Sequence, residues 1–164
     1  YYFSPGIEFG PRHLCVHPSL DIMYSSNEQG SSVTSYNFDK EKGTLSPIDT
    51  VSTIPHDFKG ENTCAQIRIS ADGKFIFVPN RGHNSIAVFS VDNEGKLTRV
   101  DIVPTEPIPR PINIDPSGNY FFVGSGIESR KLCVYRIDRQ VGKLSLLQTI
   151  DVGGSPMWIL PVNI

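Results

Sequence analysis

The residues of this chain that could do chemistry are arginines accompanied by histidines and a glutamate. Arg12 is followed by His13, and Arg81 stands in the phrase Asn80-Arg81-Gly82-His83. A guanidinium presents a planar fork of N–H donors that matches phosphate or carboxylate oxygens, and a neighbouring glutamate or histidine could act as a general base. The sequence therefore indicates an anionic substrate, with these candidate residues: Arg12, His13, Glu61, Asn62, Arg68, Asn80, Arg81, His83 and Arg110.

A repeated framework carries these residues. Asp39, Asp92 and Asp138 lie 53 and 46 residues apart, and each follows a strand-like phrase rich in β-branched and aromatic residues. In every copy one hairpin turn precedes this phrase and a second, Gly-containing turn follows it. Repeats of this length, with four short strands and no helical periodicity, are typical of β-propeller blades. We therefore expect an all-β fold.

The middle repeat predicts strands that are buried on both faces. Its run Phe75-Ile76-Phe77-Val78 is continuously aromatic or branched, and the preceding strand alternates around Ile67 and Ile69. Alternation is the period of a pleated sheet, and a continuous apolar run suits a strand covered on both sides. The pattern predicts stacked blades.

Three repeats are complete, and a fourth only begins. Because propellers use roughly four to eight blades, we expect a portion of a longer polypeptide, the remainder of which is required to close the ring. The predicted division is a tail or connecting segment over 1–9, a blade with an inserted loop over 10–63, blades over 64–109 and 110–155, and the first strand of a further blade over 156–164.

Blade topology predicts where the candidate residues meet. The start of a first strand and the end of the second lie at the same edge, since the two are antiparallel neighbours. Arg12, Glu61 and Arg110 precede first strands, and the phrase containing Arg81 ends a second strand. We therefore expect them to converge at one mouth of the central channel.

Composition excludes several classes of partner. A net charge of −2, from 15 basic and 17 acidic residues, offers no polybasic face for nucleic acid or an anionic membrane. No apolar run approaches the ~18 residues that a membrane span needs. Cys15, Cys64 and Cys133 are odd in number and lack C-x-x-C spacing, so we expect reduced thiols in a cytoplasmic protein.

The phrases Gly60-Glu61-Asn62-Thr63 and Asn80-Arg81-Gly82-His83 are similar to those of a known family. With Gly10-Pro11-Arg12-His13-Leu14 and Pro109-Arg110, the chain resembles the bacterial-type 6-phosphogluconolactonases, a group that includes the carboxy-muconate lactonising enzymes. The resemblance implies a seven-bladed propeller in which the last segment supplies a closing strand. It also implies a cytoplasmic hydrolase of carbohydrate metabolism, in the pentose phosphate pathway, that acts on a small anionic sugar lactone.

The same resemblance implies a site without metal or cofactor. Its arginine and glutamate positions match Arg12, Glu61 and Arg81 here, with His13, Arg68, His83 and Arg110 as further candidates. We expect Glu61 to act as the base or to orient a histidine, and the arginines to bind the anion. The family's P-H-x-H element lies upstream of Gly10-Pro11-Arg12 and is absent from this segment, so the segment alone is expected to be inactive.

Other roles are open for these residues. Glu61 could neutralise Arg68, the arginines could tie adjacent blades together, and His83 could serve turn geometry. Trp158 is expected to be a core residue of a strand. The alternatives to a sugar lactonase are a lactonising isomerase of the muconate type and a non-catalytic propeller that serves as a binding or assembly module.

Overall fold

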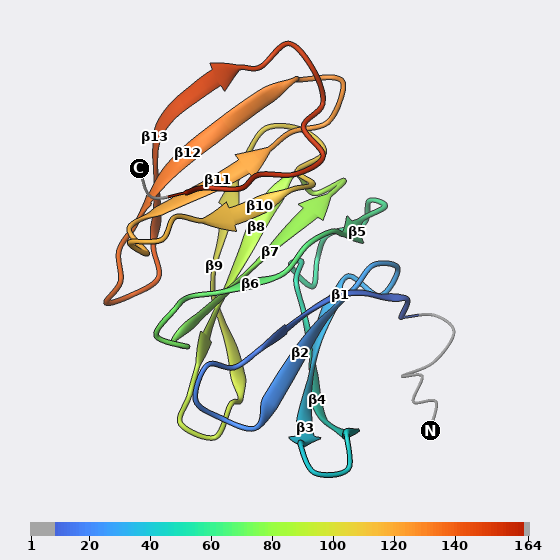
Figure 1. Cartoon of the computed structure of the whole chain (residues 1–164). Helices are drawn as coiled ribbons and strands as arrows, with labels where there is room; N and C mark the ends of the chain where they lie inside the picture. The colour runs from blue at the N-terminus through green and yellow to red at the C-terminus, as the bar shows by residue number, and fades with distance from the viewer. Residues whose placement is uncertain (1–8, 163–164) are drawn as a thin grey trace.

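Strands joined by turns and irregular loops make up residues 9–162, the part of the chain that the computed structural model describes (Figure 1). The strands form three antiparallel sheets in which chain neighbours pair in order. No helix occurs between residues 9 and 162, so the predicted all-β fold is confirmed. The predicted tail falls almost wholly on residues 1–8, outside the described residues.

The first and third sheets have four strands each. The first contains β1 (Pro11–Val16), β2 (Ile22–Asn27), β3 (Ser32–Asp39) and β4 (Thr44–Ser52). The third contains β10 (Ile112–Ile114), β11 (Tyr120–Gly124), β12 (Lys131–Ile137) and β13 (Leu144–Asp151). Both follow the up-and-down order of a propeller blade.

The middle sheet differs because its innermost strand is interrupted. Two short pieces, β5 (Thr63–Cys64) and β6 (Arg68–Ile69), both pair with β7 (Phe75–Arg81), which is followed by β8 (Ser85–Val91) and β9 (Leu97–Pro104). The interruption is bonded to both neighbouring sheets: Ala65 O accepts from Ser26 Oγ at 2.9 Å, and Gln66 Oε1 accepts from Ile112 N at 2.9 Å. The inner strand of the middle sheet thus joins all three blades.

The recurring aspartates stabilise the turns between third and fourth strands. Asp39 Oδ1 accepts the backbone N–H groups of Glu41 and Lys42 at 3.1 and 3.0 Å, and Asp92 Oδ1 accepts those of Glu94 and Lys96 at 2.9 Å each. Asp138 Oδ1 does the same for Gln140 at 2.9 Å. A carboxylate that accepts N–H groups two to four residues ahead fixes a turn, which explains why this residue marks each repeat.

Apolar packing between the sheets makes the core. Phe75 and Phe77 of β7 face the third sheet, where the Phe77 and Phe121 rings lie 4.8 Å apart between centroids. Ile76 and Val78 face the first sheet and join the cluster that holds Tyr24. Strand β7 is therefore covered on both faces, as the continuous apolar run predicted.

The inner strands lie next to one another. Both β1 and β10 contact β6, so the innermost strands of the three blades share one side of the molecule (Figure 1). In a propeller this side lines the central channel.

Residues 156–162 differ from the predicted strand. They belong to no strand of the described part of the chain, although Ile159 O accepts from Asn113 Nδ2 at 2.9 Å and thereby holds the segment beside β10. The predicted further blade has no other strand among the described residues with which this segment could pair. Trp158 was expected in the core, but it is 59% exposed.

The first testable prediction concerns the stacking of the blades. Phe77→Ala removes a completely buried ring from the cluster between the second and third sheets, so we expect the free energy of unfolding to fall by about 3–5 kcal/mol. Urea denaturation measures this change. Leu147→Ala, at a position that is 50% exposed, is the matched control, and an equal loss in both variants would contradict the stacking assignment.

Candidate functional site

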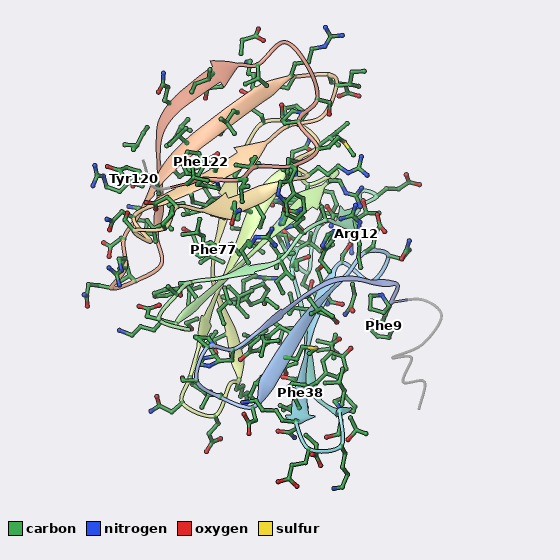
Figure 2. The ribbon with its side chains drawn as sticks, in the orientation of Figure 1. Phe9, Arg12, Phe38, Phe77, Tyr120 and Phe122 are labelled. Atoms are coloured by element: carbon green, nitrogen blue, oxygen red, sulfur yellow. The ribbon has the colours of Figure 1, made fainter. Side chains whose placement is uncertain are left out.

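A bulge at the start of β1 sets the direction of Arg12. The register of β1 against β2 shifts between Pro11 and His13, leaving Arg12 as the additional residue. Such a bulge re-aims a side chain, and the Arg12 Nε lies 3.4 Å from Glu28 Oε1. Figure 2 shows Arg12 at the end of the sheets that lies away from Phe38.

Glu28 is the carboxylate that joins the arginines. It follows β2 directly, and its backbone N–H donates to Gly10 O at 2.7 Å. Its Oε1 accepts from Arg81 Nη2, which also donates to Cys64 O at 2.8 Å. Arg81 at the end of β7 is thereby bound to the first blade and to the inner strand of its own blade.

The charges around Glu28 keep it ionised. Burial alone would raise its pKa, but the hydrogen bond from Arg81 and the charges of Arg81, Arg12 and Arg110 outweigh burial and hold the pKa below its ordinary value. Arg110 also acts on Arg12, whose pKa is lowered by burial and by the charges of Arg81 and Arg110, against the opposing effect of Glu28. We call Arg12, Arg81 and Arg110, with Glu28 among them, the arginine cluster.

The arginine cluster has more positive charge than its carboxylate neutralises. Arg12 Nη1 and Arg81 Nε are buried and have no hydrogen-bond partner, and Arg110 Nη1 lies 3.5 Å from the sulfur of Met157. Buried donors normally have partners. The cluster is therefore suited to an anion that supplies several oxygen acceptors.

His13 and Arg68 continue the basic surface along the inner strands. Burial, then the charges of Arg12 and Arg68, lower the pKa of His13, so its imidazole is neutral at pH 7. Arg68 donates to Asn113 Oδ1 at 3.2 Å and to Ile67 O at 3.0 Å, and it lies over the Trp158 ring at 5.6 Å from its centroid. The alternative pairing of Arg68 with Glu61 is thus replaced by contacts to the third blade.

Glu61 lies at the same edge as the arginine cluster but beside it. Thr63 pairs with Arg81 in the β5–β7 register, which brings Glu61 next to the loop after β7. A pocket of about 440 Å³ is lined by Glu61, Asn62, Thr63, Arg81, Gly82 and Ile108. The carboxylate between Arg12 and Arg81 is therefore Glu28, whereas Glu61 is an exposed carboxylate on the wall of the adjoining pocket.

Gly82 permits this close approach. Its φ is +125°, and a Cβ there would lie 2.1 Å from the Glu61 carbonyl oxygen. No side chain fits so near a backbone atom. The phrase Asn80-Arg81-Gly82-His83 thus requires glycine at its third position to hold Glu61 over the pocket.

Three of the predicted site residues are occupied in holding the loops. Asn80 is completely buried, with its Nδ2 donating to Thr53 O at 2.9 Å and its Oδ1 accepting from Asn62 Nδ2 at 3.3 Å. The Asn62 Oδ1 accepts the backbone N–H of His83 at 3.1 Å. The His83 ring contacts Ser85 Oγ at 2.8 Å and packs edge-on against Phe58 of the inserted loop.

This network corrects part of the predicted site. Asn80 was predicted to bind substrate, but here its side chain is buried and its amide is bonded within the protein, so it supports the loops instead of facing the pocket. Asn62 and His83 likewise have protein partners that fix the two loops to each other. Their part in the site is to position Glu61 and Arg81.

Sequence reasoning passed over Glu28 as a functional residue. The signal was its place directly after a second strand, which is equivalent to that of Arg81 one repeat later. Glu28 and Arg81 occupy equivalent positions in neighbouring blades and carry opposite charges, so their side chains can pair across the blade boundary.

The described residues contain no group of three or more His, Cys, Asp or Glu side chains arranged to hold a metal ion. Cys64 and Cys133 are buried free thiols, and Cys15 is half-buried and also free. No helix of the described chain is long and apolar enough to cross a membrane.

Comparison with known proteins identifies the family. The model of the family described as "Lactonase, 7-bladed beta-propeller" matches residues 3–161. The chain belongs to this lactonase family. The resemblance seen in the sequence phrases is thereby confirmed.

About a third of the residues in the aligned regions are identical between this chain and several of its relatives. It is 36% identical over 151 residues to a 6-phosphogluconolactonase of Yersinia pestis (strain Pestoides F), covering 92% of this chain and 45% of that protein. A protein from Lactobacillus plantarum superposes with a TM-score of 0.88 at 36% identity, covering 93% of this chain and 45% of that one. The periplasmic gluconolactonase of Pseudomonas aeruginosa gives 0.85 at 31% identity, covering 92% and 42%. The chain thus spans less than half the length of these relatives.

The second prediction concerns Glu28 and acid. A carboxyl group with a lowered folded-state pKa stabilises the fold above its ordinary pKa of ~4.3, and this contribution is lost as the pH falls through the folded-state value. Glu28→Gln leaves Arg12 and Arg81 without their carboxylate, so we expect it to lower the free energy of unfolding at pH 7 by about 1–3 kcal/mol.

Urea unfolding at pH 7 and at successively lower pH measures the effect. The difference between wild type and Glu28→Gln should shrink once the pH falls below the ordinary glutamate value. Glu128→Gln, at an exposed position, is the control and should leave stability unchanged. A difference that is independent of pH would show that the charge of Glu28 is not responsible.

Proposed function

We propose that the full-length protein hydrolyses a phosphorylated sugar lactone, with 6-phosphogluconolactone as the substrate. The observation that supports this most is the arginine cluster, in which Arg12 and Arg81 share the single carboxylate of Glu28, Arg110 adds a third positive charge nearby, and two buried N–H groups lack partners. The named relatives give the substrate class. Those relatives are about twice as long as this chain, so the proposed activity belongs to the complete ring. We place the full-length protein in the cytoplasm.

In this proposal Arg12 and Arg110 of the arginine cluster bind the phosphate. Each guanidinium can offer two N–H groups to phosphate oxygens, and Glu28 keeps Arg12 and Arg81 in place while leaving a net positive charge. Glu28 serves as a positioning residue, because a carboxylate held by two arginines is a weak base. Binding at a fixed anion site orients the lactone ring toward the adjoining pocket.

Hydrolysis then requires a base and a stabilised oxyanion. Water attacks the lactone carbonyl carbon while the Glu61 carboxylate takes a proton from the water, and Arg81 faces the oxygen on which negative charge develops. The tetrahedral intermediate collapses with cleavage of the bond between that carbon and the ring oxygen. The proton passes from Glu61 to the departing ring oxygen, which becomes a free hydroxyl, and the new carboxylic acid releases its own proton to solvent to become a carboxylate.

His13 is a second candidate for the base, favoured by its lowered pKa. A neutral imidazole beside two arginines can accept a proton at pH 7. The pH profile distinguishes the two bases, since a carboxylate base loses its activity at a lower pH than an imidazole base does.

The third prediction tests the base. Glu61→Gln keeps the shape of an exposed side chain and removes its ionisation, so we expect kcat to fall about 10²- to 10⁴-fold with the fold preserved. The assay follows acid release from 6-phosphogluconolactone with a chelator present, corrected for spontaneous opening in buffer. Glu128→Gln is the control. Full activity of Glu61→Gln together with inactive His13→Gln would transfer the role to His13.

The fourth prediction tests the anion site. Arg110 is the member of the arginine cluster whose side chain contacts Met157 rather than Glu28, so Arg110→Ala disturbs the structure least. We expect KM for the phosphorylated lactone to rise about tenfold, with kcat nearly unchanged, because the contact is made equally in ground and transition states. KM for unphosphorylated gluconolactone should not change. Arg139→Ala, at the exposed turn between β12 and β13, is the control.

A wild-type protein that opens neither lactone faster than buffer would exclude the lactonase. The choice would then lie between the lactonising isomerase and the non-catalytic binding module. Formation of a lactone from a carboxylated muconate, with no hydrolysis, would identify the isomerase.

A further inference from the structure

The pocket beside the arginine cluster has one apolar wall, and that wall is Ile108. The other lining residues offer a carboxylate, a hydroxyl, an amide and a guanidinium, from Glu61, Thr63, Asn62 and Arg81, along with the bare backbone of Gly82. Its volume of about 440 Å³ lies within the usual range for small-molecule sites. A carbohydrate ring has hydroxyls at its edge and C–H groups on its face, which matches this combination of walls.

Ile108 is held in a conformation that its own sequence disfavours. Its φ is +54°, a region that is a genuine outlier for a β-branched residue. Pro109 follows it, and a residue before proline favours extended backbone instead. The conformation is therefore imposed by tertiary contacts.

Those contacts hold the connector between β9 and β10 at several points. Asn84 binds it twice, with its Oδ1 accepting Ile108 N at 3.0 Å and its carbonyl accepting Thr105 N at 3.0 Å. Pro107 O accepts the N–H of Gly126 at 3.1 Å. A Cβ on Gly126 would lie 2.7 Å from that of Ile108, so the third blade is packed tightly behind this side chain.

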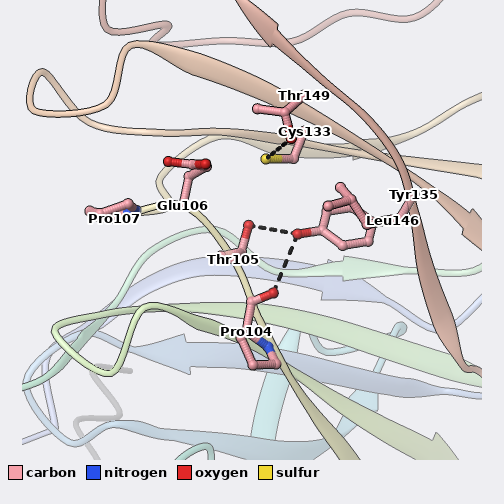
Figure 3. Close-up of a pocket in the computed structure, with 8 residues that line it drawn as sticks. All are labelled: Pro104, Thr105, Glu106, Pro107, Cys133, Tyr135, Leu146 and Thr149. Atoms are coloured by element: carbon pink, nitrogen blue, oxygen red, sulfur yellow. Dashed lines mark hydrogen bonds between the residues drawn. The ribbon is translucent and has the colours of Figure 1, made fainter.

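The outer side of the connector is fixed as well. Figure 3 shows the Tyr135 hydroxyl between Thr105 Oγ1, at 2.8 Å, and the Pro104 carbonyl, at 3.5 Å. Glu106 binds Ser129 and lies 3.3 Å from Lys131 Nζ. The charged and polar groups on this side of the connector thus anchor it, and Ile108 is presented from a rigid support to the pocket that it shares with Glu61 and Arg81.

We propose that Ile108 is a specificity-determining residue that packs against the uncharged carbohydrate part of a sugar phosphate held by the arginine cluster. This deepens the proposed function and rests on its anion site, but it does not depend on hydrolysis. Arg81 belongs to both the cluster and the pocket, so a ligand whose phosphate lies on the cluster extends naturally past Arg81. Ile108 then distinguishes a sugar phosphate from phosphate alone.

The test compares two ligands by calorimetry, 6-phosphogluconate and inorganic phosphate, on the full-length protein. Wild type should bind the sugar phosphate more tightly. Ile108→Gly should reduce the ratio of the two dissociation constants about tenfold, while the affinity for phosphate stays the same because the arginine cluster is intact. Glycine tolerates positive φ, so this variant should fold with a melting temperature close to that of wild type.

Two further variants separate the effect of the apolar Ile108 side chain from the effect of changing a residue with positive φ. Arg130→Gly changes another residue with positive φ, +56°, at an exposed site, and should leave the ratio unchanged. Ile108→Asn keeps a side chain at this position, in a conformation that asparagine accepts, but replaces the apolar surface with an amide, and it should reduce the ratio as Ile108→Gly does. An Ile108→Asn variant with the wild-type ratio would overturn the proposal.

The remaining outcomes are also decisive. An unchanged ratio in Ile108→Gly, or a wild type that does not prefer the sugar phosphate, would refute the role of Ile108 even if the protein is a lactonase. A ratio that falls as expected in a protein without hydrolytic activity would support the role of Ile108 and reject the proposed reaction.

Discussion

The structure depends on the burial of β7 between two other sheets. Phe75 and Phe77 project to one side and Ile76 and Val78 to the other, and Phe77, Ile76 and Val78 are completely buried. Apolar area removed from water stabilises the fold by roughly 25 cal/mol per Å², and a strand that packs on both faces uses every side chain for this purpose. The angle between blades follows from this packing.

Blade stacking in turn decides which polar groups meet at the edge of the sheets. Glu28 directly follows a strand of the first blade and Arg81 ends one of the second, and the two lie in contact only because the blades pack closely. The interrupted inner strand helps, since Cys64 O accepts from Arg81 and Ala65 O accepts from Ser26. The site is therefore a feature of the boundary between blades and not of any single blade.

Two kinds of positions can be distinguished at this edge. Asn80, Asn62 and His83 have their polar groups bonded within the protein and give the loops their shape. The arginine cluster and the wall of the adjoining pocket, by contrast, retain unpartnered donors, an exposed carboxylate and an apolar surface. Groups of the first kind are structural and keep groups of the second kind in place for a ligand.

The sequence by itself determined the repeat, the strand faces and the edge at which the arginines gather. These follow from local rules: the two-residue period of a strand, the turn chemistry of Asp39, Asp92 and Asp138, and the antiparallel order of a blade. It also carried the phrases by which the family could be named. Whether a segment such as 156–162 becomes a strand depends on a partner strand, so local patterns do not decide it, and in this structure the segment forms none.

Only the tertiary structure decided which carboxylate joins the arginines and which loop residues are free. Glu28 and Glu61 both lie at the predicted edge, and their spacing along the chain does not distinguish them. The angle between blades brings Glu28 to Arg12 and Arg81 and leaves Glu61 in the adjoining pocket. The positive φ of Ile108 opposes its local preference and arises from contacts with Asn84 and Gly126, in the second and third blades. Interactions between residues distant in sequence fix these features, so local patterns cannot reveal them.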